Sequence, residues 1–335
     1  MSDAHPTTAQ EPTRGAAGRR WWEVLRRLPP IFVVLFAICV WISFLNPRFA
    51  TVPGIMSFLM RAAPAVILAA GQLFVIVSGG FDLSVGSLIT LVVLGSSMLI
   101  GGDPANTWWV IAVMFLIGIA VGVFNGAVTS WLRVPSFITT LGMLVTLKGF
   151  ALLWTGGAPR GFLPNNFRVF GRSRVTGVPG LEDVPYAVII LVVVAVAAGY
   201  LLHRTGWGKQ LIALGDNPRA ARLSGVPTAR VRIGAFVASS TSAVIAGILL
   251  GGFSGVSTNV GDGQELSAIS ATVLGGAKLL GGRGTMPGAI AGALTLQALF
   301  TLLNLLGWPK PLRDGLQGLI IIGAVAYTAW RERRA

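Results

Sequence analysis

Charged residues are scarce in this sequence. Only 11% of its 335 residues are Asp, Glu, Lys or Arg, whereas 53% are hydrophobic, and the mean hydropathy is +0.74. A soluble domain carries roughly 25% charged residues, so this chain cannot cover itself with a water-facing surface. The composition therefore predicts a protein that is surrounded by membrane lipid over most of its length.

Cysteine and histidine are nearly absent as well. Cys39 is the single cysteine, and His5 and His203 are the only histidines, so neither an internal disulfide nor a Cys/His metal cluster can form. A phosphate-binding loop of the form G-x-x-x-x-G-K-S/T is missing, since Gln210 follows Lys209. We therefore expect a non-enzymatic chain without cofactors or metals. Energy for any active transport must then come from another subunit or from an ion gradient.

The excess of 14 positive charges indicates orientation in a membrane and not nucleic-acid binding. Arg and Lys fall mainly between apolar runs and form no basic surface interleaved with aromatics, so we expect no nucleic-acid partner. Cytoplasmic loops of membrane proteins are enriched in Lys and Arg. This rule predicts that both termini and the basic segment 203–229 lie on the cytoplasmic side of a bacterial inner membrane. The segment 156–183 then forms an ordered external loop or short helix.

Apolar runs predict an all-α, polytopic protein with about ten membrane-spanning helices, because each run approaches the roughly 20 residues that cross a bilayer. Together they form one transmembrane domain, 29–330, after a polar tail, 1–28, that we expect to be disordered and cytoplasmic. Five spans in each half would form an inverted repeat, a common plan among transporters. The expected spans are 29–45, 55–77, 83–100, 108–131, 136–154, 184–202, 230–250, 264–280, 285–306 and 312–330.

The Gly79-Gly80 pair interrupts the backbone just before an expected span. Asp82 or Ser84 can cap the helix that follows. A carboxylate at the centre of a bilayer costs about 2.5–3.5 kcal/mol, so Asp82 is expected near an interface, beside a polar path or at a helix N-terminus. Two interpretations stay open: a structural cap, or an element that lines or gates a translocation path. The candidate path residues are Gly79, Gly80, Asp82, Ser84, Ser87, Asn125 and Ser267.

Other small and polar residues lie at positions that favour contacts between helices. A glycine-rich stretch at 281–288 opens a later apolar run much as 79–87 does, and it suggests an internal repeat. Glycines spaced four apart predict close helix packing, and they are Gly118, Gly122 and Gly126, then Gly284, Gly288 and Gly292. Amides within apolar runs can bond either a sugar hydroxyl or a neighbouring helix, and they are Gln72, Asn125, Gln297 and Asn304.

The basic segment 203–229 contains the signals of a short capped helix. Asn217 suits the N-cap, Pro218 suits the first helical position, and Gly225 suits the end. A soluble motor domain can grip such a helix on the cytoplasmic face. An ordinary cytoplasmic loop with a chance helix is the alternative interpretation.

Four stretches, in this order, resemble the ribose-, xylose- and arabinose-type permeases of ABC importers. They are GGFDLSVGS at 79–87, FNGAVTSWLRVPSFITTLGM at 124–143, RTGWGKQLIALGDNPRAARLSGV at 204–226, and GQELSAISATVLGGAKLLGGRGTMPGAIAGAL at 263–294. The resemblance covers roughly residues 30–330. It implies a fold like that of the vitamin B12 importer permease, a dimer with the path at its interface, and import of a monosaccharide such as a pentose.

The resemblance also implies partners. A periplasmic sugar-binding protein is expected outside, with 156–183 as its contact, and an ABC ATPase subunit on the cytoplasmic face. The coupling segment of the family maps onto Gly215, Asn217, Pro218, Ala220, Ala221, Leu223, Ser224 and Gly225. The chain departs from the family at Asp216, where glycine is commoner, and after Trp308, where an aromatic-rich pattern is usual.

Other functions remain open at this stage. A permease of the same family can carry a nucleoside, a branched-chain amino acid or a furanone signal. An ion-coupled secondary transporter is a second alternative, although carboxylates within apolar segments are few, namely Asp82, Glu265 and Asp314. A membrane enzyme is disfavoured because no Ser/His/Asp or Cys/His set is present.

Overall fold

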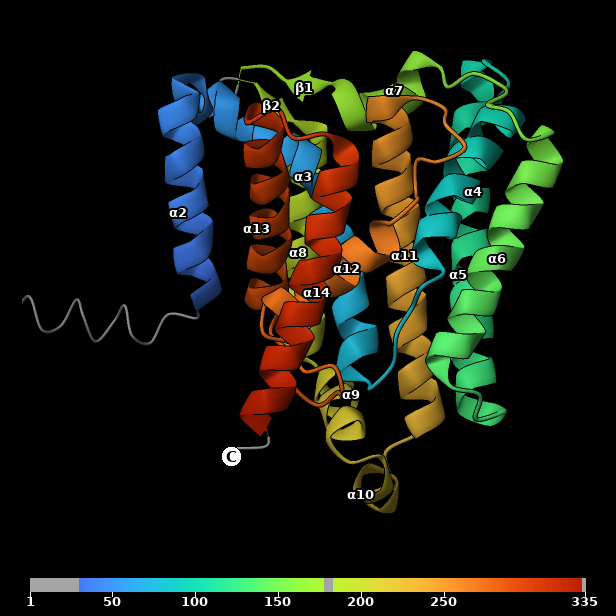
Figure 1. Cartoon of the computed structure of the whole chain (residues 1–335). Helices are drawn as coiled ribbons and strands as arrows, with labels where there is room; N and C mark the ends of the chain where they lie inside the picture. The colour runs from blue at the N-terminus through green and yellow to red at the C-terminus, as the bar shows by residue number, and fades with distance from the viewer. Residues whose placement is uncertain (1–29, 178–182, 333–335) are drawn as a thin grey trace, which may run out of the picture.

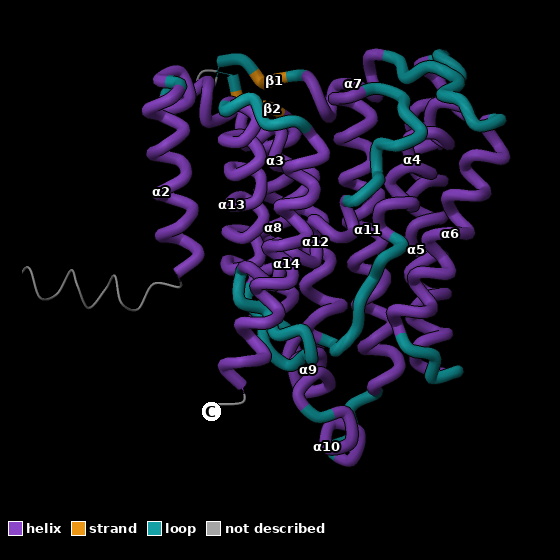
Figure 2. Tube along the Cα trace, viewed as in Figure 1, coloured by secondary structure: helices purple, strands orange, loops and turns teal. Residues whose placement is uncertain are grey.

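The computed structural model describes residues 30–177 and 183–332, and it is helical almost throughout (Figures 1 and 2). The expected disordered tail, 1–28, lies outside the described residues. The long helices are α2 (Pro30–Leu45), α3 (Val52–Val77), α4 (Val85–Ile100), α5 (Thr107–Trp131), α6 (Ser136–Thr155), α8 (Tyr186–Arg204), α11 (Thr228–Ser254), α13 (Met286–Leu305) and α14 (Lys310–Glu332). The prediction of an all-α protein is confirmed.

Short elements connect these helices. They are η1 (Pro47–Ala50), η2 (Pro104–Asn106), α7 (Asn165–Arg172), α9 (Gly206–Asp216), α10 (Pro218–Leu223), α12 (Gln264–Leu274) and the strands β1 (Arg174–Val175) and β2 (Val184–Pro185). The two strands pair antiparallel. Figure 1 shows α7 and the strand pair at one end of the helix bundle and α10 at the opposite end. The loop expected at 156–183 therefore contains a short helix, α7, although residues 178–182 are not described.

Six helices in the described part of the chain are long and apolar enough to cross a membrane. They are α3, α5 together with η2, α6, α8, α11 and α13. Two further apolar helices, α2 and α4, have 16 residues each, about 24 Å, and are shorter than the roughly 30 Å hydrocarbon core. Helix α14 coincides with the last expected span, 312–330.

The expected span 264–280 is helical only as far as Leu274. Helix α12 has 11 residues, about 16 Å, which is half the thickness of the hydrocarbon core. The helix ends because Gly276 adopts a φ of +89° and its N–H bonds back to Val273 O at 2.9 Å. Ala277, Leu279 and Leu280 misled the prediction, since they extend the largely apolar stretch without continuing the helix.

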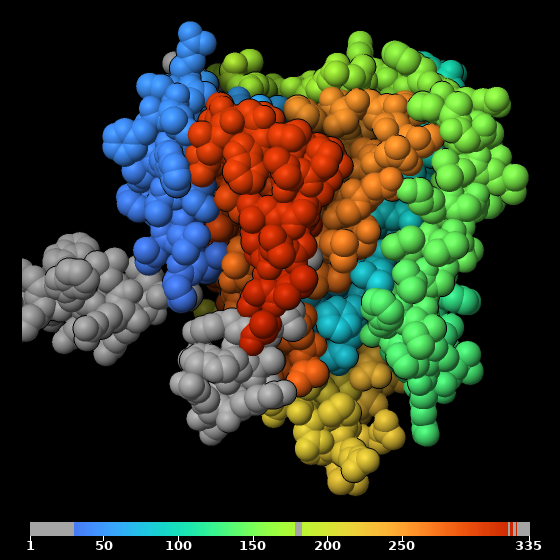
Figure 3. Space-filling model, in the orientation of Figure 1, coloured from blue at the N-terminus to red at the C-terminus, as the bar shows by residue number. Residues whose placement is uncertain are grey.

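Helix α11 is the centre of the bundle and packs against α3, α4, α5 and α7. The glycines of α5 make its contact with α11 very close. A Cβ atom at Gly122 would lie 2.7 Å from Val237 Cα, and one at Gly126 would lie 2.6 Å from Ile233 Cα. The predicted close packing of these glycines is confirmed. Figure 3 shows α14 lying across the outside of this bundle.

Replacing Gly122 with leucine is expected to destabilise the protein. The new side chain overlaps the backbone of α11, and overpacking of this kind costs about 1–3 kcal/mol. Thermal unfolding of the purified protein measures the effect. Gly142→Leu in α6 is the matched control, because a Cβ there meets nothing within 4 Å. Equal melting temperatures for the two variants would contradict the close α5–α11 contact.

Candidate functional site

Three of the candidate path residues form a buried polar cluster where α3 gives way to α4. Ser84 Oγ donates to Asp82 Oδ1 at 2.6 Å, and the Ser84 backbone N–H donates to the same oxygen at 3.0 Å. Asn125 Nδ2 on α5 donates to Ser84 Oγ at 3.0 Å. All three side chains are 0% exposed. Asp82 therefore fixes the turn that begins α4, and Asn125 ties this turn to α5.

The cluster retains unused hydrogen-bonding capacity. Asp82 Oδ2 and Asn125 Oδ1 have no partner among the described residues. The Gln72 amide, with its nitrogen and oxygen oriented to satisfy both contacts, bonds the backbone oxygen and nitrogen of Asp82, each at 3.2 Å. Because these hydrogen bonds satisfy the backbone groups of Asp82, they favour a structural role for the cluster as the cap of α4. A role of the cluster in the translocation path stays a prediction.

The remaining residues of the first glycine motif lie nearby. Gly80 is buried beside Ser136, whose Oγ accepts a hydrogen bond from the Phe81 backbone N–H at 3.0 Å. Ser87 is buried in the first turn of α4. The non-helical segment at Gly80 and Phe81 is thus packed against the start of α6.

Glycines from three distant segments meet at what we term the glycine junction, formed by Gly79, Gly215, Gly281 and Gly282. The backbone N–H of Gly282 donates to Val77 O at 2.9 Å. A Cβ at Gly281 would lie 2.9 Å from both Gly79 Cα and Gly215 O. The end of α3, the end of α9 and the loop before α13 are therefore in direct backbone contact. The two glycine stretches that resemble each other in sequence are neighbours in space.

Helix α9 contains Gly215, and the packing of this helix holds Gly215 in the glycine junction. Thr205 Oγ1 accepts from the Gly208 backbone N–H at 3.1 Å and so caps the helix. The Trp207 ring lies against Phe74 of α3, with ring centroids 5.4 Å apart. Leu211 is fully buried on the same helix. Helix α9 therefore contacts α3 through packed side chains as well as through the glycine junction.

The expected short helix is present as α10, and its predicted caps are confirmed. Asn217 Oδ1 accepts from the backbone N–H groups of Arg219 and Ala220 at 3.1 and 3.0 Å, and Pro218 occupies the first helical position. Ser224 follows as the C-cap, and Gly225 has a φ of +81°.

The side chains of α10 divide between the protein and the exterior. Ala221 is buried, while Arg219, Ala220 and Arg222 are exposed. Leu223 is 90% exposed, and it belongs to α10, which lies at the end of the bundle opposite α7 (Figure 1). Leu223 and its exposed neighbours Arg219, Ala220 and Arg222 form the outward surface of α10.

Ser267 belongs to a separate cavity of about 530 Å3 between α12, α13 and α14, which we term the Ser267 cavity. Gln317 Nε2 donates to Ser267 Oγ at 2.8 Å. Polar side chains and one aromatic ring line the cavity, among them Asp262, Gln264, Gln297, Phe300, Asp314 and Gln317. Gln297 was one of the amides noted in the sequence. Gln317 also lies beside an apolar run, and the same signal would have found it, whereas Gln264 lies between Asp262 and Glu265 in a polar stretch.

A comparison with protein-family models finds a match over most of the chain. The family described as branched-chain amino acid transport system / permease component matches residues 54–325. The chain belongs to this permease family. The permease is accordingly a multi-pass membrane protein, and its apolar helices supply the spans.

Relatives of the permease include import permeases of two kinds. The ribose import permease protein RbsC of Escherichia coli (strain K12) is 35% identical over 322 residues, which cover 93% of this chain and 97% of that protein. Its counterpart from Bacillus subtilis (strain 168) is 35% identical over 309 residues, or 90% and 92% of the two chains. The autoinducer 2 import system permease protein LsrC of Shigella flexneri is 33% identical over 286 residues, or 85% and 82%. No solved structure matches the permease at a significant level.

Proposed function

We propose that the permease is the membrane-spanning subunit of an ABC importer that carries a monosaccharide, a pentose or a similar sugar, from the periplasm to the cytoplasm. A separate ATPase subunit drives it, and a periplasmic sugar-binding protein delivers the sugar. Two relatives with 35% identity are named ribose import permeases. The exposed tip of α10 is the observation that carries the proposal for this chain.

The tip of α10 suits contact with an ATPase subunit. Leu223 is 90% exposed, and burial of a leucine side chain contributes roughly 1.5–3 kcal/mol. The helix is capped at both ends, so it can transmit a push without unwinding. Motion of α9 and α10 reaches the breaks at 79–84 and 275–285 through the glycine junction. The coupling residues proposed from the sequence therefore have a direct mechanical connection to the broken helices.

The opposite end of the bundle is the proposed docking face for the binding protein. Helix α7 and the strand pair lie there, at the far end from α10 (Figure 1). With α10 in the cytoplasm, this end is periplasmic and both termini are cytoplasmic, as the Lys and Arg distribution favours. A second copy of the permease completes the path in this proposal.

The Ser267 cavity suits passage of a sugar. Its glutamines and Ser267 offer donors and acceptors for hydroxyl groups, and Phe300 offers an apolar face. Most of the side chains that line the cavity are polar or charged, which suits a ligand with many hydroxyl groups. We propose that the sugar crosses beside this cavity and binds weakly there, because selectivity resides in the binding protein.

Ser267→Ala together with Gln317→Leu is expected to lower the amount of sugar transported per ATP. Loss of a hydrogen bond between uncharged groups costs about 0.5–1.5 kcal/mol, so a reduction of roughly 2- to 10-fold is expected for each lost bond to the sugar. Uptake of labelled sugar in proteoliposomes measures it. Thr146→Ala is the control, since this hydroxyl bonds only its own helix, at Gly142 O, among the described residues. An unchanged ratio of sugar to ATP would exclude the cavity from the path.

The overall proposal is tested by uptake into proteoliposomes that contain the permease, its ATPase and its binding protein. Labelled ribose should accumulate only with ATP and the binding protein, and dissipating ion gradients should have no effect. Accumulation of a furanone signal in place of ribose would favour the autoinducer 2 alternative, which the similarity to LsrC supports. Uptake driven by an ion gradient without the ATPase would refute the proposal.

A further inference from the structure

Three arginines from distant parts of the chain line one cavity, which we term the arginine cavity. It has a volume of about 450 Å3 and lies where α2, η1 and the start of α3 meet the end of α13. Arg48 comes from η1, Arg61 from α3 and Arg313 from α14. Uncharged polar side chains complete the lining, namely Asn46, Ser57, Gln297, Thr301 and Asn304.

No described residue neutralises the charges in the arginine cavity. None of the described residues that line it is acidic, and none of the three arginines has a carboxylate within ion-pair distance among the described residues. The acidic residue beside Arg313, Asp314, pairs with Lys310 at 3.0 Å and lines the neighbouring Ser267 cavity. Three like charges around one space repel one another, and a bound anion removes this repulsion.

Hydrogen-bond donors in the cavity are also unused. Arg313 Nε is buried and has no hydrogen-bond partner among the described residues, and within this part of the chain its Nη1 makes only a long contact of 3.4 Å with Asn304 Oδ1. Ser57 already receives a hydrogen bond from Arg174 Nη2 at 3.0 Å, which brings a fourth arginine to the rim. Guanidinium groups bind phosphate oxygens with paired, charge-assisted hydrogen bonds. The donor set therefore favours a phosphate-bearing ligand.

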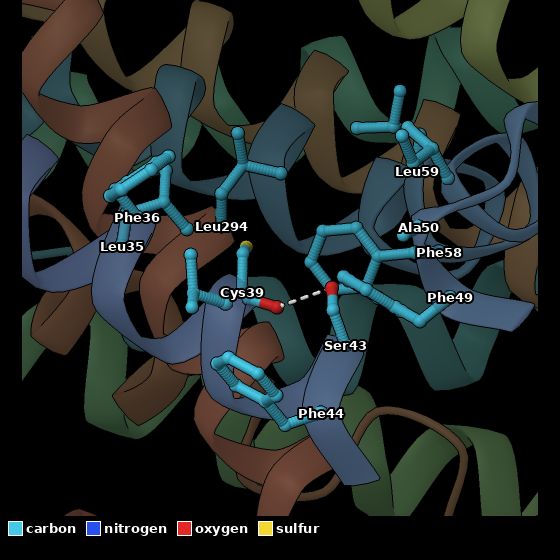
Figure 4. Close-up of a pocket in the computed structure, with 12 residues that line it drawn as sticks. Leu35, Phe36, Cys39, Ser43, Phe44, Phe49, Ala50, Phe58, Leu59 and Leu294 are labelled. Carbon is cyan, nitrogen blue, oxygen red and sulfur yellow. Dashed lines mark hydrogen bonds between the residues drawn. The ribbon is translucent and has the colours of Figure 1, made fainter. Parts of the chain in front are cut away.

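An apolar groove adjoins the arginine cavity. The groove has a volume of about 540 Å3, and Phe49 lines both spaces. Its other walls come from α2, α3 and Leu294 of α13 (Figure 4). Phe36 and Phe44 of α2 are 70% and 82% exposed, so the groove faces the lipid side of this outermost helix. None of the residues described as lining it carries a charge.

We propose that this corner of the permease binds an anionic phospholipid. The phosphate headgroup contacts Arg48 and Arg61 in the arginine cavity, and an acyl chain lies in the apolar groove past Phe49. The guanidinium groups of the arginine cavity can donate charge-assisted hydrogen bonds to an anionic headgroup in the leaflet at the α7 end. The location at the ends of α2 and α13 is at headgroup depth. A soluble anion or an acidic protein side chain would use the arginines but leave the groove without an occupant.

Native mass spectrometry of the purified full-length permease tests the proposal, with phosphatidylglycerol and phosphatidylcholine of identical chains as probes. Wild type is expected to bind phosphatidylglycerol at least about tenfold more tightly. Each substitution, Arg48→Gln or Arg61→Gln, is expected to weaken this preference roughly fivefold, the effect of about 1 kcal/mol per basic residue. Arg172→Gln is the matched control, because Arg172 is exposed on α7 at the same end and lines neither space.

Other occupants give different results. Equal binding of the two lipids by wild type would overturn the proposal. Inorganic phosphate that displaces phosphatidylglycerol at equal concentration would indicate a soluble anion site instead. A short-chain phosphatidylglycerol that binds as tightly as the long-chain lipid would exclude the groove. If Arg48→Gln and Arg61→Gln weaken docking of the binding protein but keep the lipid preference, the arginines serve a protein carboxylate.

Discussion

Leu223→Glu is expected to abolish ATP-driven uptake by preventing assembly of the permease with its ATPase. The Leu223 side chain is 90% exposed, so the permease itself should fold and melt as wild type does. In the assembled importer we expect the ATPase to bury the new carboxylate. An uncompensated buried charge costs about 3–5 kcal/mol, which corresponds to at least roughly 100-fold weaker association. Copurification of the ATPase and uptake in proteoliposomes measure the two effects.

Two further variants make this test specific. Leu223→Met preserves the size and polarity of the side chain and should assemble normally. Ala220→Glu should act like Leu223→Glu, since Ala220 is also exposed on α10. Ala221 is a poorer probe because it is buried and a larger side chain there disturbs the fold. Normal assembly and uptake with Leu223→Glu would remove α10 from the ATPase contact.

Gly215→Ala is expected to leave the importer assembled but unable to transport. A Cβ at this position overlaps Val77 O and lies close to the backbone nitrogen of Gly282, and neither backbone atom can move aside as a side chain can. The three segments of the glycine junction must therefore separate. Because α10 is unaltered, the ATPase should still bind and hydrolyse ATP. Overpacking typically costs about 1–3 kcal/mol, and overlap with backbone atoms costs more than this. We therefore expect sugar uptake per ATP to fall by an order of magnitude or more.

Gly206→Ala is the control for the glycine junction. Gly206 lies at the start of the same helix, α9, and a Cβ there meets nothing within 4 Å. Its uptake per ATP should equal that of wild type. If Gly215→Ala transports normally, the junction does not connect α10 to the broken helices. If it fails to bind the ATPase, its defect lies in folding and not in coupling.

Local rules of sequence predicted the elements whose structure depends on neighbouring residues. Helix α10 follows from the Asn217-Pro218 pair and a terminal glycine, and its caps formed as expected. The long apolar helices follow from hydrophobic runs alone. The end of α12 was missed because Ala277, Leu279 and Leu280 are apolar but follow a left-handed glycine, and hydrophobicity does not record backbone conformation.

Features that depend on contacts between distant segments could be predicted only in part from the sequence. The sequence indicated Gly79, Gly215 and the stretch at 281–288 separately, but their meeting requires the fold. Asp82 was left between a cap and a path element, and its burial with Ser84 depends on α5. The three arginines of the arginine cavity are far apart in the sequence, and charge patterns along a chain do not show which segments converge.

The central claim is that α10 lies on the cytoplasmic side and is covered by the ATPase. Cys39 is the single cysteine, so Cys39→Ser with Leu223→Cys gives one reactive thiol at the exposed tip. A membrane-impermeant maleimide should label this thiol in inside-out vesicles, should fail in right-side-out vesicles, and should be blocked when the ATPase is bound. Labelling from the periplasmic side, or labelling that the ATPase leaves unaffected, would contradict the account.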